Sequence, residues 1–196
     1  MKAKLKENGF FRVLLKMNML PVIILTLIIT TFSAARFATS MSVEVKDGLV
    51  NMCQTVITLY DTAYQGDYHV EDQDGTVYMM KGEQVLNGDY TIVDSIKEKT
   101  GIDITIFCRD TRVITTIRTG DYVRAIGTKA NDTVIDDVLK GGHPQFYTST
   151  IVEGVQYFSY YEPLYASDGT CIGMIFLGKF PQIWEKGLKL FQYIVK

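Results

Sequence analysis

A run of 19 residues without a charged side chain lies between Lys16 and Arg36, with the sequence MNMLPVIILTLIITTFSAA. In a helix that rises ~1.5 Å per residue, this run is about 28 Å long, which is close to the hydrocarbon thickness of a bilayer. The sequence therefore predicts a transmembrane helix over residues 17–36. A cleaved signal peptide is the alternative, because Ser33 and Ala35 are small residues at a suitable cleavage spacing. The length of the run and of its basic lead-in favours the transmembrane helix.

Charge is distributed unevenly along the chain. Residues 1–36 contain six Lys or Arg and one Glu, while the remainder contains 14 Lys or Arg and 21 Asp or Glu. Five of the six basic residues precede the uncharged run. Because basic residues stay on the cytoplasmic side of a membrane, we expect residues 1–16 in the cytoplasm and everything after the span outside it. The net charge of −7 after residue 36 argues against a nucleic-acid partner.

The sequence contains only three cysteines and two histidines, the residue types that most often act as nucleophiles or metal ligands, and they lie far apart. Cys53, Cys108 and Cys171 are an odd number in an extracytoplasmic setting, and each lies in an apolar stretch, so we interpret them as small buried hydrophobic residues. His69 and His143 are far apart and have no Cys or carboxylate at ligand spacing. The sequence thus predicts no metal site, no cofactor and no catalytic residue.

An amphipathic stripe follows the membrane span. Apolar residues recur at intervals of three and four over residues 37–65, which predicts one long helix that continues out of the membrane. Val43, Val50 and Ile57 are spaced seven residues apart, so this helix could pack against a second copy and form a homodimer. Alternatively, the stripe covers the chain's own sheet.

The rest of the chain predicts an α+β domain over residues 66–181. Residues 66–90 are rich in Gly, Asp and Asn and indicate loops with short strands near 77–80. The predicted elements after them are a helix over 91–101, a hairpin over 103–118, a short strand over 123–126, a short helix over 133–140, and strands over 154–161 and 171–178. Pro163 is expected to end the penultimate strand. Residues 182–196 look like a helix leading toward a second membrane span that this chain lacks.

The hairpin DITIFCRDTRVITTIR has two faces if it turns at Asp110 and Thr111, because successive strand residues point to opposite faces. One face is dry and carries Ile104, Ile106, Cys108, Val113, Thr115 and Ile117. The other face is mixed and carries Asp103, Thr105, Phe107, Ile114, Thr116 and Arg118. Arg109 and Arg112 are expected in solvent at the turn. We expect helices over the dry face and a small-molecule cavity under loops on the mixed one.

The mixed face suits a small organic acid. Arg118 can bind a carboxylate with two donors, and the Thr116 hydroxyl can complete the contact. The alternative is that Arg118 forms an ion pair with Asp103 across the strands. In the strand over 154–161, either face could meet the cavity; we favour the face with tyrosine and serine hydroxyls, and expect Tyr147 to act as a lid from a loop. The candidate ligand-binding residues are Phe107, Thr116, Arg118, Tyr147, Tyr157, Ser159 and Tyr161.

The chain contains, in this order, a basic start, a span, a long helix and then the motifs GIDITIFCRDTRVITTI, IGTKA, VLKGG, YFSYYEPLY and DGTCIGMIFLGK. In the order of these parts, the chain resembles the single Cache sensor domains of bacterial transmembrane receptors. The resemblance covers residues 20–181 and is closest to domains that precede chemotaxis or diguanylate cyclase modules. It implies a PAS-like antiparallel sheet of about five strands on a long amino-terminal helix, with a pocket for a small, often carboxylate-bearing, ligand.

The expected function is thus a single-pass membrane sensor that binds an organic acid or amino acid outside the cytoplasm and relays its occupancy through helices. One alternative is a truncated receptor that pairs with full-length receptors through the long helix. An anchored hydrolase is disfavoured, because the sequence lacks a G-x-S-x-G elbow and an H-E-x-x-H helix.

Overall fold

The computed structural model describes residues 2–120 and 122–181, and side chains from residue 17 onward. These residues divide into two compact units, Met1–Glu44 and Val45–Lys196. Helix α1 (Lys2–Ala63) provides the first unit and the start of the second. It contains one stretch that is long and apolar enough to cross a membrane, and the large apolar side chains between Met17 and Phe32 are 49–72% exposed. Such a surface needs an apolar environment such as lipid.

The second unit is α+β, as predicted. After α1 its elements are β1 (Tyr68–Gln73), β2 (Thr76–Lys81), β3 (Gln84–Val85), α2 (Thr91–Thr100), β4 (Asp103–Cys108), β5 (Thr111–Thr115), α3 (Asp132–Val134), a π-helical turn (Ile135–Lys140), β6 (Gln145–Val152), β7 (Val155–Tyr165) and β8 (Cys171–Lys179).

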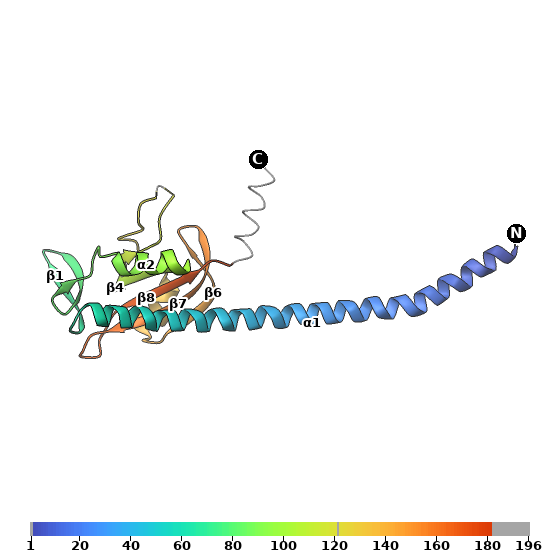
Figure 1. The fold of residues 1–196 in the computed structure, drawn as a ribbon, viewed down its shortest axis with the longest axis horizontal. Helices are drawn as coiled ribbons and strands as arrows, with labels where there is room; N and C mark the ends of the chain where they lie inside the picture. Colours follow the sequence, from blue (N-terminus) through green and yellow to red (C-terminus); the bar gives the residue numbers. More distant parts are fainter. Residues whose placement is uncertain (1, 121, 182–196) are drawn as a thin grey trace. The chain divides into compact units, whose positions relative to one another are not determined.

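The main sheet has five antiparallel strands in the order β5-β4-β8-β7-β6, and it confirms the predicted PAS-like sheet. The apolar strand β8 lies at its centre, between β4 and β7 (Figure 1). Seven of the nine β8 residues are buried, which fits a strand covered on both faces.

One face of the sheet packs on helices, and we call this packed region the first core. Its buried side chains come from α1, α2 and the strands, and include Leu49, Cys53, Val56, Tyr60, Val93, Ile96, Ile104, Ile106, Ile175 and Leu177. The periodic stripe of the long helix therefore covers the chain's own sheet, as one of the two sequence interpretations proposed. Val50 and Ile57 pack against this core as well.

The opposite face of the sheet is covered by the segment between β5 and α3 and by the helical turns over 132–140, and we call this packed region the second core. Its buried members are Phe107, Ile117, Ala125, Ala130, Val134, Val138, Val152, Tyr157, Tyr161, Met174 and Phe176. Loops and short helices cover this face, as the sequence predicts. The segment over 123–126 forms only an isolated bridge from Arg124 to Arg118, so the strand predicted there is absent.

The segment predicted as mostly loop, residues 66–90, contains a three-stranded sheet in the order β1-β2-β3 beside the end of α1 (Figure 1). Lys81 is buried in it and pairs with Asp61 of α1 at 2.7 Å, and its ammonium lies 4.1 Å from the centre of the Tyr68 ring. This sheet is built from two consecutive hairpins, with turns at Asp74–Gly75 and Gly82–Glu83, and the polar composition of the segment hid its strands.

Two other elements differ from the prediction. Residues expected in a loop after His143 form β6, and β7 does not end at Pro163 but continues to Tyr165. Strand β6 pairs with β7 only up to Tyr161, so Pro163 lies where the β6 side of β7 is open and its missing N–H removes no ladder bond. The helix predicted over 133–140 is present but is mostly π-helical, and Asn131 caps it.

The hairpin of β4 and β5 is shifted from the predicted register. The observed pairs are Thr105 with Thr115, Ile106 with Ile114, Phe107 with Arg112 and Cys108 with Thr111. The turn therefore consists of Arg109 and Asp110, and Val113 is an extra residue in a β-bulge. Because a shift by one residue moves side chains to the opposite face, Ile114 packs in the first core and Ile117 in the second, which is the reverse of the prediction.

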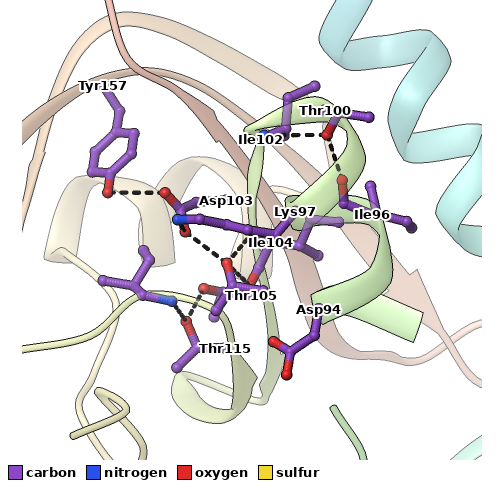
Figure 2. A network of polar contacts seen from close by, with 12 residues as sticks. Asp94, Ile96, Lys97, Thr100, Ile102, Asp103, Ile104, Thr105, Thr115 and Tyr157 are labelled. Atoms are coloured by element: carbon purple, nitrogen blue, oxygen red, sulfur yellow. Dashed lines mark hydrogen bonds and ion pairs between the residues drawn. The ribbon is translucent and has the colours of Figure 1, made fainter. Parts of the chain in front are cut away.

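A buried carboxylate connects α2 to the sheet. Asp103, the first residue of β4, has a side chain with no exposed surface. It accepts hydrogen bonds from Thr116 Oγ1 at 2.7 Å, from Tyr157 OH at 3.2 Å, and from the Lys97 ammonium of α2. Figure 2 shows Tyr157 and Lys97 reaching this carboxylate from different elements. Asp103 thus fixes the position of the Tyr157 hydroxyl relative to α2.

Helix α2 has a second connection to the covering segment. Arg124 binds Asp94 of α2 with two hydrogen bonds, at 2.9 and 2.5 Å, and donates another to the Thr115 carbonyl at 2.7 Å. Its guanidinium also lies 3.9 Å from the centre of the Tyr90 ring. A bidentate pair of this kind is more restrictive than a single contact, so it fixes the segment after β5 to α2.

We expect Asp103→Asn to reduce the free energy of unfolding by about 1–3 kcal/mol, because it removes the buried charge that Lys97 and two hydroxyls bind. Urea unfolding of the full-length chain, followed by circular dichroism, measures the change. Asp136→Asn is the matched control, since Asp136 forms an exposed pair with Lys140, and no measurable change is expected there. Equal stability of the two variants would contradict the structural role of Asp103.

The different burial of the three cysteines leads to a second prediction. Cys53 and Cys108 are buried, and burial raises the pKa of their thiols to about 12 and about 11; Cys171 is only half-buried. Because the thiolate is the reactive form, native full-length protein treated with iodoacetamide at pH 8 should be modified first at Cys171. Mass spectrometry should find the other two thiols modified only after denaturation. Modification of native Cys53 as fast as Cys171 would show that the first core is wrongly packed.

Candidate functional site

The β-bulge brings Arg112 to the second core. Arg112 lies opposite Phe107, and the residue is only 6% exposed. Its backbone N–H donates to the Thr128 carbonyl, and its carbonyl accepts from Gly127 N–H, both at 2.9 Å. The segment that covers the second core therefore runs alongside β5 at Arg112.

The guanidinium of Arg112 has unequal contacts around its planar group. Its carbon lies 5.2 Å from the centre of the Phe107 ring, which is within the range of a cation–π contact. Nη1 donates to Thr128 Oγ1 and lies 3.5 Å from Glu153 Oε1. Nε is buried and has no hydrogen-bond partner among the described residues. The edge of the guanidinium that includes Nε thus carries a donor that the described protein groups leave unused.

Burial lowers the pKa of Arg112, while the neighbouring Tyr161, Glu153 and Tyr157 raise it. An arginine starts from so high a pKa that its guanidinium remains charged at neutral pH. The second core therefore contains a permanent positive charge, and Glu153 is the acidic side chain that pairs with it.

Tyrosines form a wall in the same core. The Tyr161 ring lies 5.1 Å from that of Phe176 and 5.9 Å from that of Tyr147, measured between centroids. The Tyr157 ring lies 5.9 Å from that of Phe176. Burial raises the pKa of both Tyr157 and Tyr161, and Arg112 acts in the opposite direction on each. Both phenols stay protonated at neutral pH. Tyr157 donates its proton to Asp103, so the Tyr161 phenol is the one of the two that can donate to a ligand.

The seven residues predicted to bind a ligand fall into three groups. Phe107, Tyr157 and Tyr161 are buried in the second core, and Tyr147 packs against it. Tyr147 belongs to strand β6 rather than to a loop, and its hydroxyl donates to Asp137 at 2.8 Å.

Thr116 and Ser159 are buried, but their hydroxyls already have partners in the protein. Thr116 Oγ1 donates to Asp103 and accepts from Ile104 N–H at 3.0 Å. Ser159 Oγ is paired with Thr150 Oγ1 at 2.6 Å. These two residues therefore hold the strands and the Asp103 carboxylate in place.

Arg118 lies apart from both groups. It is exposed, and its Nη1 donates to the Tyr122 carbonyl at 3.0 Å. The predicted pairing of Arg118 with Asp103 was wrong, because the bulge changes the register before the strand reaches this residue.

Arg112, which sequence reasoning placed in solvent, is the buried cation of this face. The hairpin pattern alone has no signal for it: the contacts that bury Arg112 come from Thr128 and Glu153, both distant in sequence. Among the described residues, no group of three or more His, Cys, Asp or Glu could hold a metal ion.

Comparison with known proteins gives one family. The family model described as "Single cache domain 3" matches residues 84–185, just over half of the chain. No curated protein sequence matches. Among solved structures, the sensor domain of Escherichia coli DcuS is similar, with 12% sequence identity, 52% of this chain and 73% of that chain covered, and a TM-score of 0.36.

The matched region includes β4 to β8, the covering segment and both residues of the Arg112–Glu153 pair. The sheet, the second core and the buried guanidinium therefore all lie within the part of the chain that the family describes. This chain belongs to the single Cache domain family, which consists of ligand-binding domains of signalling proteins.

Proposed function

We propose that the chain is a membrane-anchored extracytoplasmic sensor that binds the carboxylate of a small organic acid or amino acid at Arg112. One observation carries the proposal: a guanidinium that is buried, charged and, within the described part of the chain, without a partner at Nε. Leaving a buried donor unpaired costs about 1–3 kcal/mol, which a ligand oxygen would recover. Arginine binds carboxylates with two parallel hydrogen bonds, so a carboxylate is the best-matched ligand group.

The neighbouring side chains suit the rest of a small ligand. Phe107, Tyr157 and Tyr161 offer apolar ring surface, the Tyr161 phenol adds a donor, and Tyr147 covers the site from β6. A mostly apolar site with a few well-placed polar groups is typical of small-molecule binding. The proposed ligand contacts are thus Arg112, Phe107, Tyr147, Tyr157 and Tyr161. Thr116 and Ser159 support them from behind, and Arg118 is not included.

A ligand at this site would be coupled to the helices through Tyr157. Its hydroxyl donates to Asp103, which also binds Lys97 of α2, and Ile96 of α2 packs in the first core with α1. We propose this route for relaying occupancy in chemotaxis or another signalling pathway. A ligand can drive such a relay only if it binds two arrangements of these contacts with different affinity.

The orientation in the membrane is part of the proposal. Basic residues precede the apolar run of α1, which supports an amino terminus in the cytoplasm and a Cache domain outside it. The family has a binding role rather than a catalytic one, and we propose no enzymatic activity and no cofactor for the chain.

The direct test is ligand binding to the full-length chain in lipid nanodiscs, measured by isothermal titration calorimetry. The panel consists of acetate, lactate, succinate, malate, citrate and L-alanine. We expect at least one of them to bind, and Arg112→Gln to weaken that binding about 100-fold, since each hydrogen bond to a charged group contributes about 1.5–3 kcal/mol and a carboxylate can accept two from arginine.

Arg118→Gln is the matched control, because it removes the same charge from an exposed arginine close to the end of β5. Its affinity should equal that of the unmodified chain. Binding that survives in Arg112→Gln but is lost in Arg118→Gln would return the site to the position that the sequence alone suggested and refute the one proposed here.

A groove between α1 and α2 supports the proposed homodimer. Its volume is about 430 Å³, and it is lined by Met52, Thr55, Leu59, Thr91, Ile92, Ser95, Ile96, Lys99 and Thr100. Leu59 is 41% exposed there. Because an exposed apolar groove on a helix pair favours association with another helix, we propose that α1 of a second copy lies against it.

If α1 does dimerise here, Leu59→Glu should shift the full-length chain in detergent from dimer to monomer, because it places a charge in the apolar groove. Sedimentation velocity at several protein concentrations measures the change. Gln54→Glu introduces the same side chain at an exposed position of α1 that does not line the groove, and it should leave the dimer intact. A chain that is monomeric before substitution would exclude the homodimer.

A further inference from the structure

The turn that joins β6 to β7 consists of Glu153 and Gly154, between the paired residues Val152 and Val155. Both turn residues have positive φ, 49° for Glu153 and 78° for Gly154. A two-residue hairpin turn with this backbone favours Asn, Asp or Gly at its first position, because a longer side chain is strained at positive φ. Glutamate is therefore a poor choice for the turn itself, and strained residues of this kind often have a function.

The side chain of Glu153 supplies a reason for its presence. Its Oε1 lies 3.5 Å from Nη1 of Arg112, and the side chain is 28% exposed, whereas that of Arg112 is 8% exposed. This separation is within the range of an ion pair but is too long for a good hydrogen bond. Glu153 thus neutralises the buried guanidinium while leaving its hydrogen-bonding capacity largely unused.

We infer that Glu153 is a built-in competitor of the ligand: its carboxylate is the counterion of Arg112 in the empty site, and a ligand carboxylate replaces it. This inference rests on the proposed function of Arg112. The better hydrogen bonds that a ligand can form at Nε favour replacement. Glu153 therefore limits the affinity of the site for anions.

The alternative role for Glu153 is a direct ligand contact, in which it accepts a hydrogen bond from the ammonium of an amino acid. The two roles predict opposite effects when the carboxylate is removed. A competitor weakens anion binding, so its removal tightens it; a contact strengthens amino acid binding, so its removal weakens it.

The experiment compares Glu153→Gln and Glu153→Asn with the unmodified full-length chain in nanodiscs, using acetate and L-alanine in calorimetric titrations. Glu153→Gln removes the charge and keeps the length of the side chain, whereas Glu153→Asn also suits the positive φ of the turn. We expect both variants to bind acetate at least about tenfold more tightly, because a negative charge close to the binding cation has been removed. Glu83→Gln, at an exposed position, is the charge control and should change nothing.

Unchanged, weaker or undetectable acetate binding in both variants would overturn the inference. Weaker L-alanine binding without tighter acetate binding would identify Glu153 as a ligand contact and overturn it as well. Failure of the proposed function itself has a different signature. In that case the tighter acetate binding of Glu153→Gln would persist in the double variant Arg112→Gln with Glu153→Gln, whereas the inference requires that it disappear.

Discussion

The burial of the Arg112 charge is the constraint on which the functional face of this domain depends. A guanidinium can be buried only if nearby groups compensate its charge, and here these are the Phe107 ring, the Thr128 hydroxyl and the Glu153 carboxylate. The three groups come from a strand, a covering segment and a turn that are far apart in sequence. Correct folding of all three is therefore necessary before the site exists, and Nε, which is unpaired among the described residues, is a donor left for a ligand.

The two faces of the sheet have different roles in the domain. The first core packs α1 and α2 on the sheet with apolar side chains, so it supplies stability and carries the helices. The second core combines apolar residues with Arg112 and hydroxyl-bearing rings, so it supplies recognition. Asp103 lies at the boundary and binds Tyr157 from one side and Lys97 from the other. A shift of Tyr157 on ligand binding would therefore have a direct physical route to α2.

Many features that depend on local sequence could be predicted, although the local hairpins of β1, β2 and β3 were missed, and features that depend on distant contacts could not be predicted. The apolar run of α1 and the helix α2 with its left-handed stop at Gly101 follow from periodicity and end signals within a few residues. The bulge at Val113 was missed because the contacts of β5 with Gly127 and Thr128 help to set it. Because of this error, Arg118 was predicted as the cation of the site, whereas the buried cation is Arg112. The aromatic wall was predicted more accurately, since the alternation along β7 places Tyr157 and Tyr161 on one face whatever the register of the hairpin.

The most direct test of the account is the side-chain ¹⁵N–¹H NMR signal of Arg112 Nε in the full-length chain in nanodiscs, titrated with the tightest-binding acid of the panel. A hydrogen bond to a carboxylate should shift this signal in a saturable way, at the same ligand concentration as calorimetric binding, while the Nε signal of Arg118 stays in place. Saturable calorimetric binding with no change at Arg112 Nε would contradict the claim that this guanidinium recognises the ligand.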